Sequence, residues 1–336
     1  MPAHRHRHAV SPADPDASRL PRATVVVTAC GDDRGLRDTL ERLRPQVDRV
    51  DAELLLIFNT WPDDISRGDR DELEGLVDVL LFEPRTGKSH ALNTAVRATN
   101  SEVVAFTDDD ATPGNHWLIE LLRPLADDPS AAGVGGPIEP VFPAEGPPSW
   151  YRLIVARRAT HFLGPKHHLE DGVTEYERPR GGSTSPVPLG ANMAWRRSWL
   201  ERFPFRTDLG PNRETGLRGG EDTCLGLEIL EAGGAVRYAP HALVHHHVAP
   251  ERMELDFVER CYAAQGLEYA RVLTHLGRRP DDEAKLRRSA RPQPVKDAWR
   301  RIGPSHRRIK RRFAKAFAAS ACEELERLCT GSRKAE

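Results

Sequence analysis

Four short apolar runs, separated by segments of helical or turn-forming character, constrain the fold of this chain more than any other feature. The runs are residues 24–28, 54–58, 77–82 and 103–106. After the first run, Leu36, Leu40 and Leu43 recur at helical spacing, and residues 87–98 are expected to form a helix before the fourth run. Strands that alternate with helices predict an α/β fold whose mostly parallel sheet is covered by helices.

The composition excludes several classes of protein. The chain has 336 residues, of which 39% are hydrophobic and 29% charged, and its formal net charge of −1 gives no overall attraction for nucleic acid. No apolar run approaches the roughly 20 residues of a transmembrane helix, and no signal peptide is recognisable at the N-terminus. The five cysteines are scattered, as expected in a reducing cytoplasm. We therefore expect a cytoplasmic protein without a nucleic-acid partner.

The chain is expected to divide into three parts. Residues 1–21 are rich in His, Pro, Asp and Ser without periodicity, which predicts a disordered tail. Residues 22–255 carry the strand and helix pattern and form the main domain. Residues 256–336 predict a helical, basic C-terminal extension. Within the main domain, residues 143–188 are dense in Pro, Gly, Arg and His and suit a flexible lid or an acceptor loop.

Three consecutive carboxylates, Asp108, Asp109 and Asp110, directly follow the fourth apolar run. Residues in this position lie at the exit of a buried strand, where open α/β sheets bind their ligands. Adjacent carboxylates repel one another unless a cation or hydrogen-bond donors offset the charge. A divalent ion that bridges to a phosphate is a common solution, because magnesium and manganese prefer oxygen ligands. An isolated Asp triplet, however, is more often a solvated turn. The neighbouring motifs therefore decide between a cation site and a turn.

Four signatures follow one another along the chain. They are Val25-Val26-Val27 with its turn; residues 84–93 with Gly87-Lys88; residues 106–110 with Trp117-Leu118 downstream; and residues 219–225 between Gly190-Ala191-Asn192-Met193 and Tyr238-Ala239-Pro240. Each is weak alone, but the ordered set resembles family 2 glycosyltransferases, an inverting class that uses nucleotide-sugar donors. The resemblance covers residues 23 to about 255. It implies a GT-A fold, with a Rossmann-like, mostly parallel sheet flanked by helices and here a C-terminal helical extension.

The resemblance implies a site for a nucleotide-sugar and a divalent metal, Mn²⁺ or Mg²⁺. Its Asp-x-Asp element assigns metal binding to Asp108 and Asp110, and donor contact to Asp108 and Asp109. Lys88 combines a positive charge with the free N–H groups of a helix start, which suits a phosphate, although an exposed helix lysine is equally consistent with the sequence. The remaining donor-binding candidates are Thr28, Ala29, Asn59 and Arg85.

Transfer to an alcohol requires a base, because the attacking hydroxyl must lose its proton. The family's base corresponds to Asp222, and Glu221 would orient the acceptor or a cationic neighbour. Alternatively, the two carboxylates simply favour a helix N-terminus. Asn192 and Gly220 are the acceptor-side candidates. His246, with His245 as the alternative, is a possible third metal ligand or else a structural histidine.

Two departures from the family pattern affect the expected donor. Thr28-Ala29-Cys30-Gly31 replaces the usual Pro-Thr-Tyr-Asn, and Phe58 replaces the Asp that reads uracil. Base recognition would then rest on Asn59, Asp32 or backbone groups. A UDP-sugar remains the expected donor, with other bases open. The family's processive members carry a Gln-x-x-Arg-Trp motif after the catalytic base. No such motif follows Asp222 in this sequence, which favours a non-processive enzyme.

Two other functions compete with this prediction. A sugar-phosphate nucleotidyltransferase has a similar sheet but needs a basic, Gly-rich loop after the first strand, whereas Asp32 and Asp33 make this loop acidic. A non-catalytic nucleotide-sugar-binding module would not need Asp222. The glycosyltransferase prediction leaves the sugar open, and the hydroxyl acceptor could be a glycan, a lipid-linked intermediate or a small molecule.

The basic C-terminal segment has two interpretations. Phe313, Ala316 and Phe317 share one face with little acid nearby, so the segment could lie peripherally on the inner face of an anionic membrane. A solvated helix with i,i+4 ion pairs needs no such partner.

Overall fold

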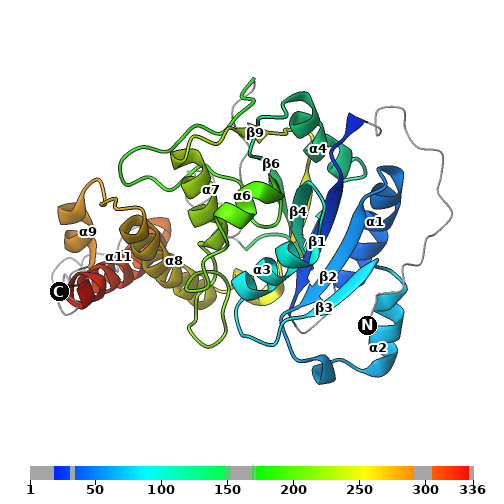
Figure 1. Cartoon of the computed structure of the whole chain (residues 1–336). Coiled ribbons are helices and arrows are strands. Elements are labelled where there is room, and N and C mark those ends of the chain that lie inside the picture. Colours follow the sequence, from blue (N-terminus) through cyan, green and yellow to red (C-terminus); the bar gives the residue numbers. More distant parts are fainter. Residues whose placement is uncertain are drawn as a thin grey trace.

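The computed structural model describes residues 19–30, 35–148, 150–151, 169, 172–290 and 305–332. Residues 1–18 of the expected tail, Asp32 and Asp33, and residues 152–168 of the expected lid lie outside this set. The described residues form two sheets flanked by helices (Figure 1). The predicted α/β architecture with a mostly parallel sheet is therefore confirmed.

The larger sheet has seven strands in the order β3-β2-β1-β4-β8-β6-β9. Their bounds are β1 Ala23–Ala29, β2 Glu53–Phe58, β3 Val79–Phe82, β4 Val103–Asp108, β6 Gly133–Gly135, β8 Met193–Arg196 and β9 Val236–Tyr238. Strands β1 to β4 are parallel, whereas β8 runs antiparallel to both β4 and β6. The smaller sheet has the order β5-β10-β7, with β5 Ala111–Pro113, β7 Ile138–Val141 and β10 Val244–His247.

Helices cover both faces of the larger sheet (Figure 1). The α-helices are α1 Leu36–Arg49, α2 Arg67–Glu74, α3 Lys88–Ala98, α4 Trp117–Asp127, α6 Arg197–Arg202, α7 Glu221–Glu231, α8 Leu255–His275, α9 Glu283–Ala290 and α11 Ser305–Ser332. Two 3₁₀ helices are η2 Pro62–Asp64 and η3 Pro250–Met253. Helices α1 and α4 pack on one face and α3, α6 and α7 on the other, because alternate residues of each strand point to opposite faces.

The order of the strands places a ligand site between β1 and β4. From β1 the chain crosses to β2 on one side and returns to β4 on the other. This reversal opens a crevice at the carboxyl ends of the two strands. Thr28 and Asp108 are register partners at those ends. After Asp110 the chain forms β5 rather than a simple turn, and β5 pairs with β10, which carries the three histidines.

Helix α11 packs along α8 in the C-terminal part (Figure 1). Phe313 is only 2% exposed, and its ring stacks on Tyr262 at 4.9 Å between centroids. A Cβ atom at Gly266 would lie 2.1 Å from the Phe317 carbonyl oxygen, so the two helices approach closely at this glycine. The apolar face that suggested a membrane contact is therefore covered by α8. Among the described helices, none combines the length and the apolar character that a membrane span requires.

Candidate functional site

Asp108 ends β4 and lies beside the first residue of α3. Its carboxylate forms an ion pair with Lys88, and its Oδ1 accepts a hydrogen bond of 3.4 Å from the Thr28 hydroxyl. Gly87 directly precedes α3 and has φ of +119°, a conformation that glycine adopts without strain. The turn before α3 thus directs the lysine towards the end of β4.

Lys88 connects two acidic segments that are far apart in the sequence. A Cβ atom built at Gly190 would lie 3.5 Å from both Lys88 Nζ and Asp222 Oδ2, so both atoms border the same small space beside Gly190. Burial alone would lower the pKa of Lys88, but the carboxylates of Asp108, Glu221 and Asp222 offset this and raise it. The structure therefore brings the aspartate triplet and the Glu-Asp pair together around one ammonium group, and this cluster of side chains is named the acidic cleft.

Asp110 faces a cationic side chain and an imidazole. Arg252 Nη2 lies 2.8 Å from its Oδ2, and His246 Nε2 lies 3.4 Å from its Oδ1. The same His246 nitrogen is 3.3 Å from Arg252 Nη1. His246 reaches this position because it pairs with Ala111 across the small sheet, and its neighbours His245 and His247 point to the other face.

Asp222 is the second residue of α7. Its Oδ2 accepts a hydrogen bond of 2.8 Å from Gly190 N, and its Oδ1 accepts one of 2.6 Å from Thr223 N. Oδ1 accepts a second bond of 3.2 Å from the Thr223 hydroxyl, so these bonds fix the orientation of the carboxylate and leave a lone pair on Oδ2 for a further donor. Gly220, directly before the helix, has φ of +91°, which turns the chain sharply into α7.

Two carboxyl groups in the cleft have strongly raised pKa values. Burial, together with the charges of Asp110 and Asp108, raises the pKa of Asp109 to about 7. Burial and the charge of Asp222 raise the pKa of Glu221 to about 8. Glu221 is 3% exposed, and its Oε2 has no hydrogen-bond partner among the described residues. The cleft therefore holds more acidic groups than its own cations neutralise.

This imbalance predicts how the stability of the metal-free protein depends on pH. Unfolded Asp and Glu titrate near 3.8 and 4.5, well below the folded values for Asp109 and Glu221. The folded state thus binds more protons, and stability decreases as pH rises from about 5 to 8. In EDTA we expect the free energy of unfolding to fall on the order of 3 kcal/mol over this interval.

Chemical denaturation at several pH values measures this decrease, and Glu221→Gln provides the comparison because its amide does not titrate. The variant should show a flatter profile than the natural protein. Equal slopes in the two proteins would contradict the assignment of the decrease to Glu221.

The donor types around the triplet suit a divalent cation, although the ligand atoms of Asp108, Asp110 and His246 are not gathered within 4.8 Å of one another as those of Cys224, Glu228 and His275 are. Asp108 and Asp110 offer carboxylate oxygens and His246 an imidazole nitrogen, a donor set that Mn²⁺ accepts. The raised pKa of Asp109 indicates that positive charge is missing at this point. A cation beside the triplet would supply it.

Several predicted site residues have structural partners. The Asn59 amide donates to the carbonyl oxygens of Glu83 and Arg85 and accepts from Gly87 N, so it holds the loop before α3. Arg85 is largely exposed and pairs with the buried Glu83, whose pKa it lowers to about 2. Ala29 is buried, and its carbonyl oxygen accepts from Asn59 N. Donor contact by these residues stays a prediction.

Asn192 is placed differently from its expected position on the acceptor side. It is 0% exposed, its amide donates to Pro137 O and Ala242 O, and its oxygen accepts from Trp117 Nε1. Because all these polar atoms are used inside the protein, the side chain has no direct route to an acceptor. It holds β7, α4 and the chain before β10 together.

Two residues that touch the site were not among the candidates. Arg252 follows the three histidines by a few residues, and its guanidinium contacts Asp110. Glu268 on α8 accepts hydrogen bonds from the backbone directly before α7, and nothing in its local sequence suggests this contact.

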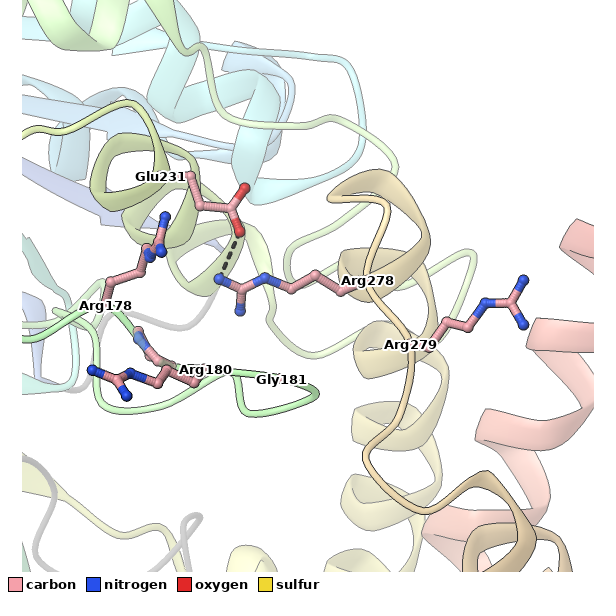
Figure 2. Close-up of a pocket in the computed structure, with 7 residues that line it drawn as sticks. Arg178, Arg180, Gly181, Glu231, Arg278 and Arg279 are labelled. Atoms are coloured by element: carbon pink, nitrogen blue, oxygen red, sulfur yellow. Dashed lines mark ion pairs between the residues drawn. The ribbon is translucent and has the colours of Figure 1, made fainter.

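A separate cavity of about 380 Å³ is lined by Arg178, Arg180, Arg278 and Glu231 among other residues (Figure 2). Arg278 and Glu231 form an ion pair of 2.6 Å there. Glu231 ends α7, whereas Asp222 lies near its start, so roughly 14 Å of helix separates them at 1.5 Å per residue. This cavity is therefore distinct from the acidic cleft.

Comparison with solved structures confirms the GT-A fold. A mannosyltransferase from Pyrobaculum calidifontis in complex with GDP-Man and Mn²⁺ superposes with a TM-score of 0.56 at 20% identity, over 94% of this chain and 90% of that one. Glucosyl-3-phosphoglycerate synthase from Mycobacterium tuberculosis, with Mn²⁺, UDP and phosphoglyceric acid, gives a TM-score of 0.51 at 18% identity, over 82% and 86% of the two chains.

Sequence comparison identifies the family. A pre-mycofactocin glycosyltransferase of Mycobacterium tuberculosis is 31% identical over 170 residues, which cover 51% of this chain and 32% of that protein. The chain spans about a third to three fifths of the length of the curated relatives it matches. The model of the Glycosyltransferase like family 2 matches residues 21–265, most of the chain, and the protein therefore belongs to this family.

Proposed function

We propose that this protein is a non-processive, inverting glycosyltransferase that moves a sugar from a nucleotide-sugar to a hydroxyl acceptor. One observation carries the proposal: Asp108, at the end of β4, and Asp222, at the start of α7, face the same small space around the Lys88 ammonium. A departing diphosphate needs positive charge nearby, and an incoming alcohol needs a group that accepts its proton. Lys88 and Asp222 offer these two functions within the acidic cleft.

The acceptor hydroxyl would donate a hydrogen bond to the Asp222 carboxylate, which takes its proton as the oxygen attacks the anomeric carbon. Gly190 N and Thr223 N hold this carboxylate in place. Attack from the side opposite the leaving group inverts the anomeric configuration. Lys88 would face the diphosphate, where negative charge develops. A divalent ion held by Asp108, Asp110 and His246 would neutralise further charge on that diphosphate.

The donor base is the least constrained part of the proposal. Phe58, which replaces the family's uracil-reading Asp, is 1% exposed and stacks on Phe82 in the core, so it does not line a base site. The Asn59 amide is occupied by backbone groups. Base recognition would therefore rest on backbone groups near the end of β2. The two solved neighbours were obtained with UDP and with GDP-Man, and a UDP-sugar remains our first proposal.

The acceptor class stays open among a glycan, a lipid-linked intermediate and a small molecule. The apolar face of α11 no longer supports contact with a membrane surface, because α8 covers this face. Arg312 of α11 also pairs with Asp256 and Glu259 of α8 rather than standing free.

A screen of UDP- and GDP-sugars tests the proposed function. We expect release of nucleoside diphosphate from one donor in the presence of Mn²⁺, little release in EDTA, and an increase when a suitable acceptor is added. NMR of the product should show the anomeric configuration opposite to that of the donor. Nucleotide-sugar binding without release, across all donors and acceptors, would favour a non-catalytic binding module instead.

A further inference from the structure

The loop between α6 and α7, residues 203–220, lies against the start of α3, where Lys88 is. Its backbone contacts α3 directly, because Pro211 O accepts from Lys88 N at 3.0 Å and Leu209 O accepts from the buried Ser89 hydroxyl at 2.9 Å. The loop then closes on itself through a hydrogen bond of 2.9 Å from Gly210 N to Gly219 O. Any displacement of this loop moves the start of α7 relative to Lys88.

Glu268 of α8 holds the end of this loop. Its Oε1 accepts hydrogen bonds from Arg218 N at 2.7 Å and from Gly219 N at 2.9 Å. The Glu268 side chain is 6% exposed, and a Cβ atom built at Gly220 would lie 3.2 Å from the Cβ atom of Glu268. A buried carboxylate is costly unless hydrogen bonds compensate it. Here both compensating bonds come from the two residues before the turn that starts α7.

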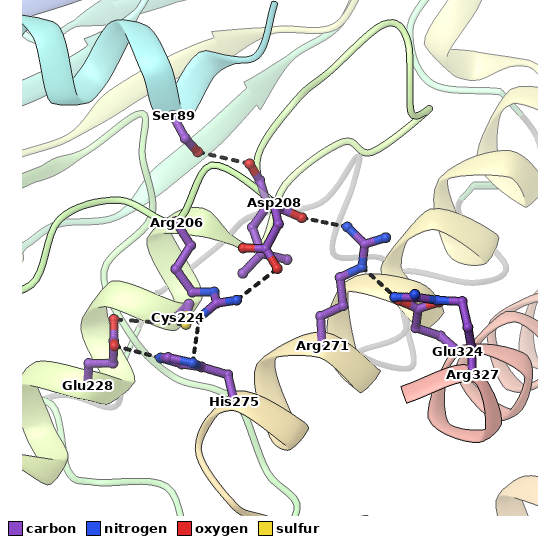
Figure 3. Close-up of polar contacts among 10 residues, drawn as sticks. Ser89, Arg206, Asp208, Cys224, Glu228, Arg271, His275, Glu324 and Arg327 are labelled. Atoms are coloured by element: carbon purple, nitrogen blue, oxygen red, sulfur yellow. Dashed lines mark hydrogen bonds and ion pairs between the residues drawn. The ribbon is translucent and has the colours of Figure 1, made fainter. Parts of the chain in front are cut away.

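Arg271, one helical turn along α8, holds the other part of the loop (Figure 3). Its Nη1 donates to Asp208 O at 2.6 Å, and its Nε donates to Glu324 of α11 at 2.8 Å. Glu324 is itself buried and also pairs with Arg327. Glu324 of α11 therefore fixes the orientation of the Arg271 guanidinium, and the guanidinium in turn holds the loop at Asp208.

His275, a further turn along α8, contacts α7 itself. Its Nε2 lies 2.7 Å from Glu228, and its Nδ1 lies 2.5 Å from Arg206 (Figure 3). Cys224 and Glu228 lie close enough to His275 to share a metal. The Arg206 charge disfavours a cation there, however, and burial raises the pKa of the Cys224 thiol. These contacts fit a junction between helices.

We propose that Glu268 and Arg271 are positioning residues for sugar transfer, through which α8 and α11 set the place and direction of Asp222. Both residues, and Glu324 behind them, lie beyond residue 265, where the family match ends. The inference rests on the proposed function. It assigns a part in transfer to helices α8 and α11, which would act through the loop before α7.

The test compares Glu268→Ala with Glu268→Gln. The amide oxygen of Gln can accept the same two backbone N–H groups, whereas Ala leaves them without a partner. Because a misplacement of about 1 Å can cost on the order of 100-fold in rate, we expect kcat of Glu268→Ala to fall about 10- to 100-fold. Glu268→Gln should stay within about threefold, and KM for the donor should stay within about twofold in both variants.

Arg271→Ala provides a second variant in case Glu268→Ala does not fold. Glu324 keeps Arg327 as a partner in this variant, and only the bond to Asp208 O is lost from the loop. We again expect a fall in kcat with unchanged Mn²⁺-dependent nucleotide binding. Arg287→Ala is the matched control, because Arg287 on α9 also pairs with α11, through Glu326, but contacts no part of the loop. Its kcat should not change.

Hydrogen exchange separates this inference from the proposed function, because it does not depend on turnover. The amides of Arg218 and Gly219 should exchange faster in Glu268→Ala than in Glu268→Gln, and the amides of β4 should not change. If the natural protein transfers no sugar, the proposed function fails and the inference fails with it, whereas the exchange data still report whether the contact exists. Folded Glu268→Ala and Arg271→Ala proteins with normal kcat would overturn the positioning role alone.

Discussion

Asp222→Asn is expected to abolish most sugar transfer while leaving donor binding intact. A general base contributes about 10²- to 10⁴-fold to rate, so kcat should fall about 1,000-fold. The Asn side chain has nearly the same shape, and its oxygen can still accept from Gly190 N or Thr223 N, so α7 should keep its place. Steady-state kinetics gives the loss of kcat, and calorimetry with nucleoside diphosphate and Mn²⁺ gives the donor affinity.

Asp69→Asn is a suitable control for this experiment. Asp69 is also an acidic residue in the first turn of a helix, α2, but it is exposed, and within the described part of the chain its side chain bonds to Ser66, the N-cap residue of α2. Its replacement should leave kcat unchanged. If Asp222→Asn transferred sugar at the natural rate, the base would have to be another group of the cleft, with Glu221 the first to examine.

The local sequence pattern predicts the positions of site residues that lie at the ends of strands and at the starts of helices. The apolar run of β4 predicts where Asp108 leaves the sheet, and the alternation of strands and helices predicts that Thr28 leaves at the same edge. Likewise, the carboxylates of Glu221 and Asp222 suit a helix N-terminus, and α7 begins at Glu221. Such features depend on a few neighbouring residues, so they can be predicted from the sequence.

Other placements depend on partners that are distant in sequence. Asn192 resembles a polar residue beside a site, but the backbone carbonyl groups that accept its hydrogen bonds come from the residue before β7 and from the chain before β10. Phe313 lies on an amphipathic helix, and amphipathicity shows that a partner exists without showing whether it is a membrane or α8. Glu268 is one of many acidic residues in the C-terminal helices, and only the fold brings it to Arg218.

Lys88→Met should make the folded protein dependent on a divalent ion. Lys88 and Asp108 are 16% and 22% exposed, so their ion pair is largely shielded from water. Removing one partner of such a pair typically costs about 3 to 5 kcal/mol, because the other charge stays buried without compensation. The nearby carboxylates of Glu221 and Asp222 also lose a cation. In EDTA, the free energy of unfolding of the variant should therefore fall by about 3 kcal/mol or more.

Mn²⁺ should restore much of this loss, and it should stabilise Lys88→Met more than it stabilises the natural protein. In the natural protein the ammonium already neutralises Asp108, so an ion gains less there than beside the uncompensated carboxylate of the variant. Chemical denaturation of both proteins, with EDTA and with increasing Mn²⁺, measures the difference. Lys285→Met, an exposed lysine of α9, is the control and should respond to Mn²⁺ as the natural protein does.

Mn²⁺ should restore the stability of Lys88→Met without restoring its donor binding. Even with saturating Mn²⁺, Lys88→Met lacks the ammonium that would face the donor diphosphate, so its affinity for nucleoside diphosphate should be lower than that of the natural protein. Restored stability with weakened donor affinity separates the two tasks of Lys88, neutralising the acidic cleft and contacting phosphate. If Mn²⁺ stabilised both proteins equally, the ion would bind beyond the electrostatic reach of Lys88, and the assignment of Asp108 as its ligand would be wrong.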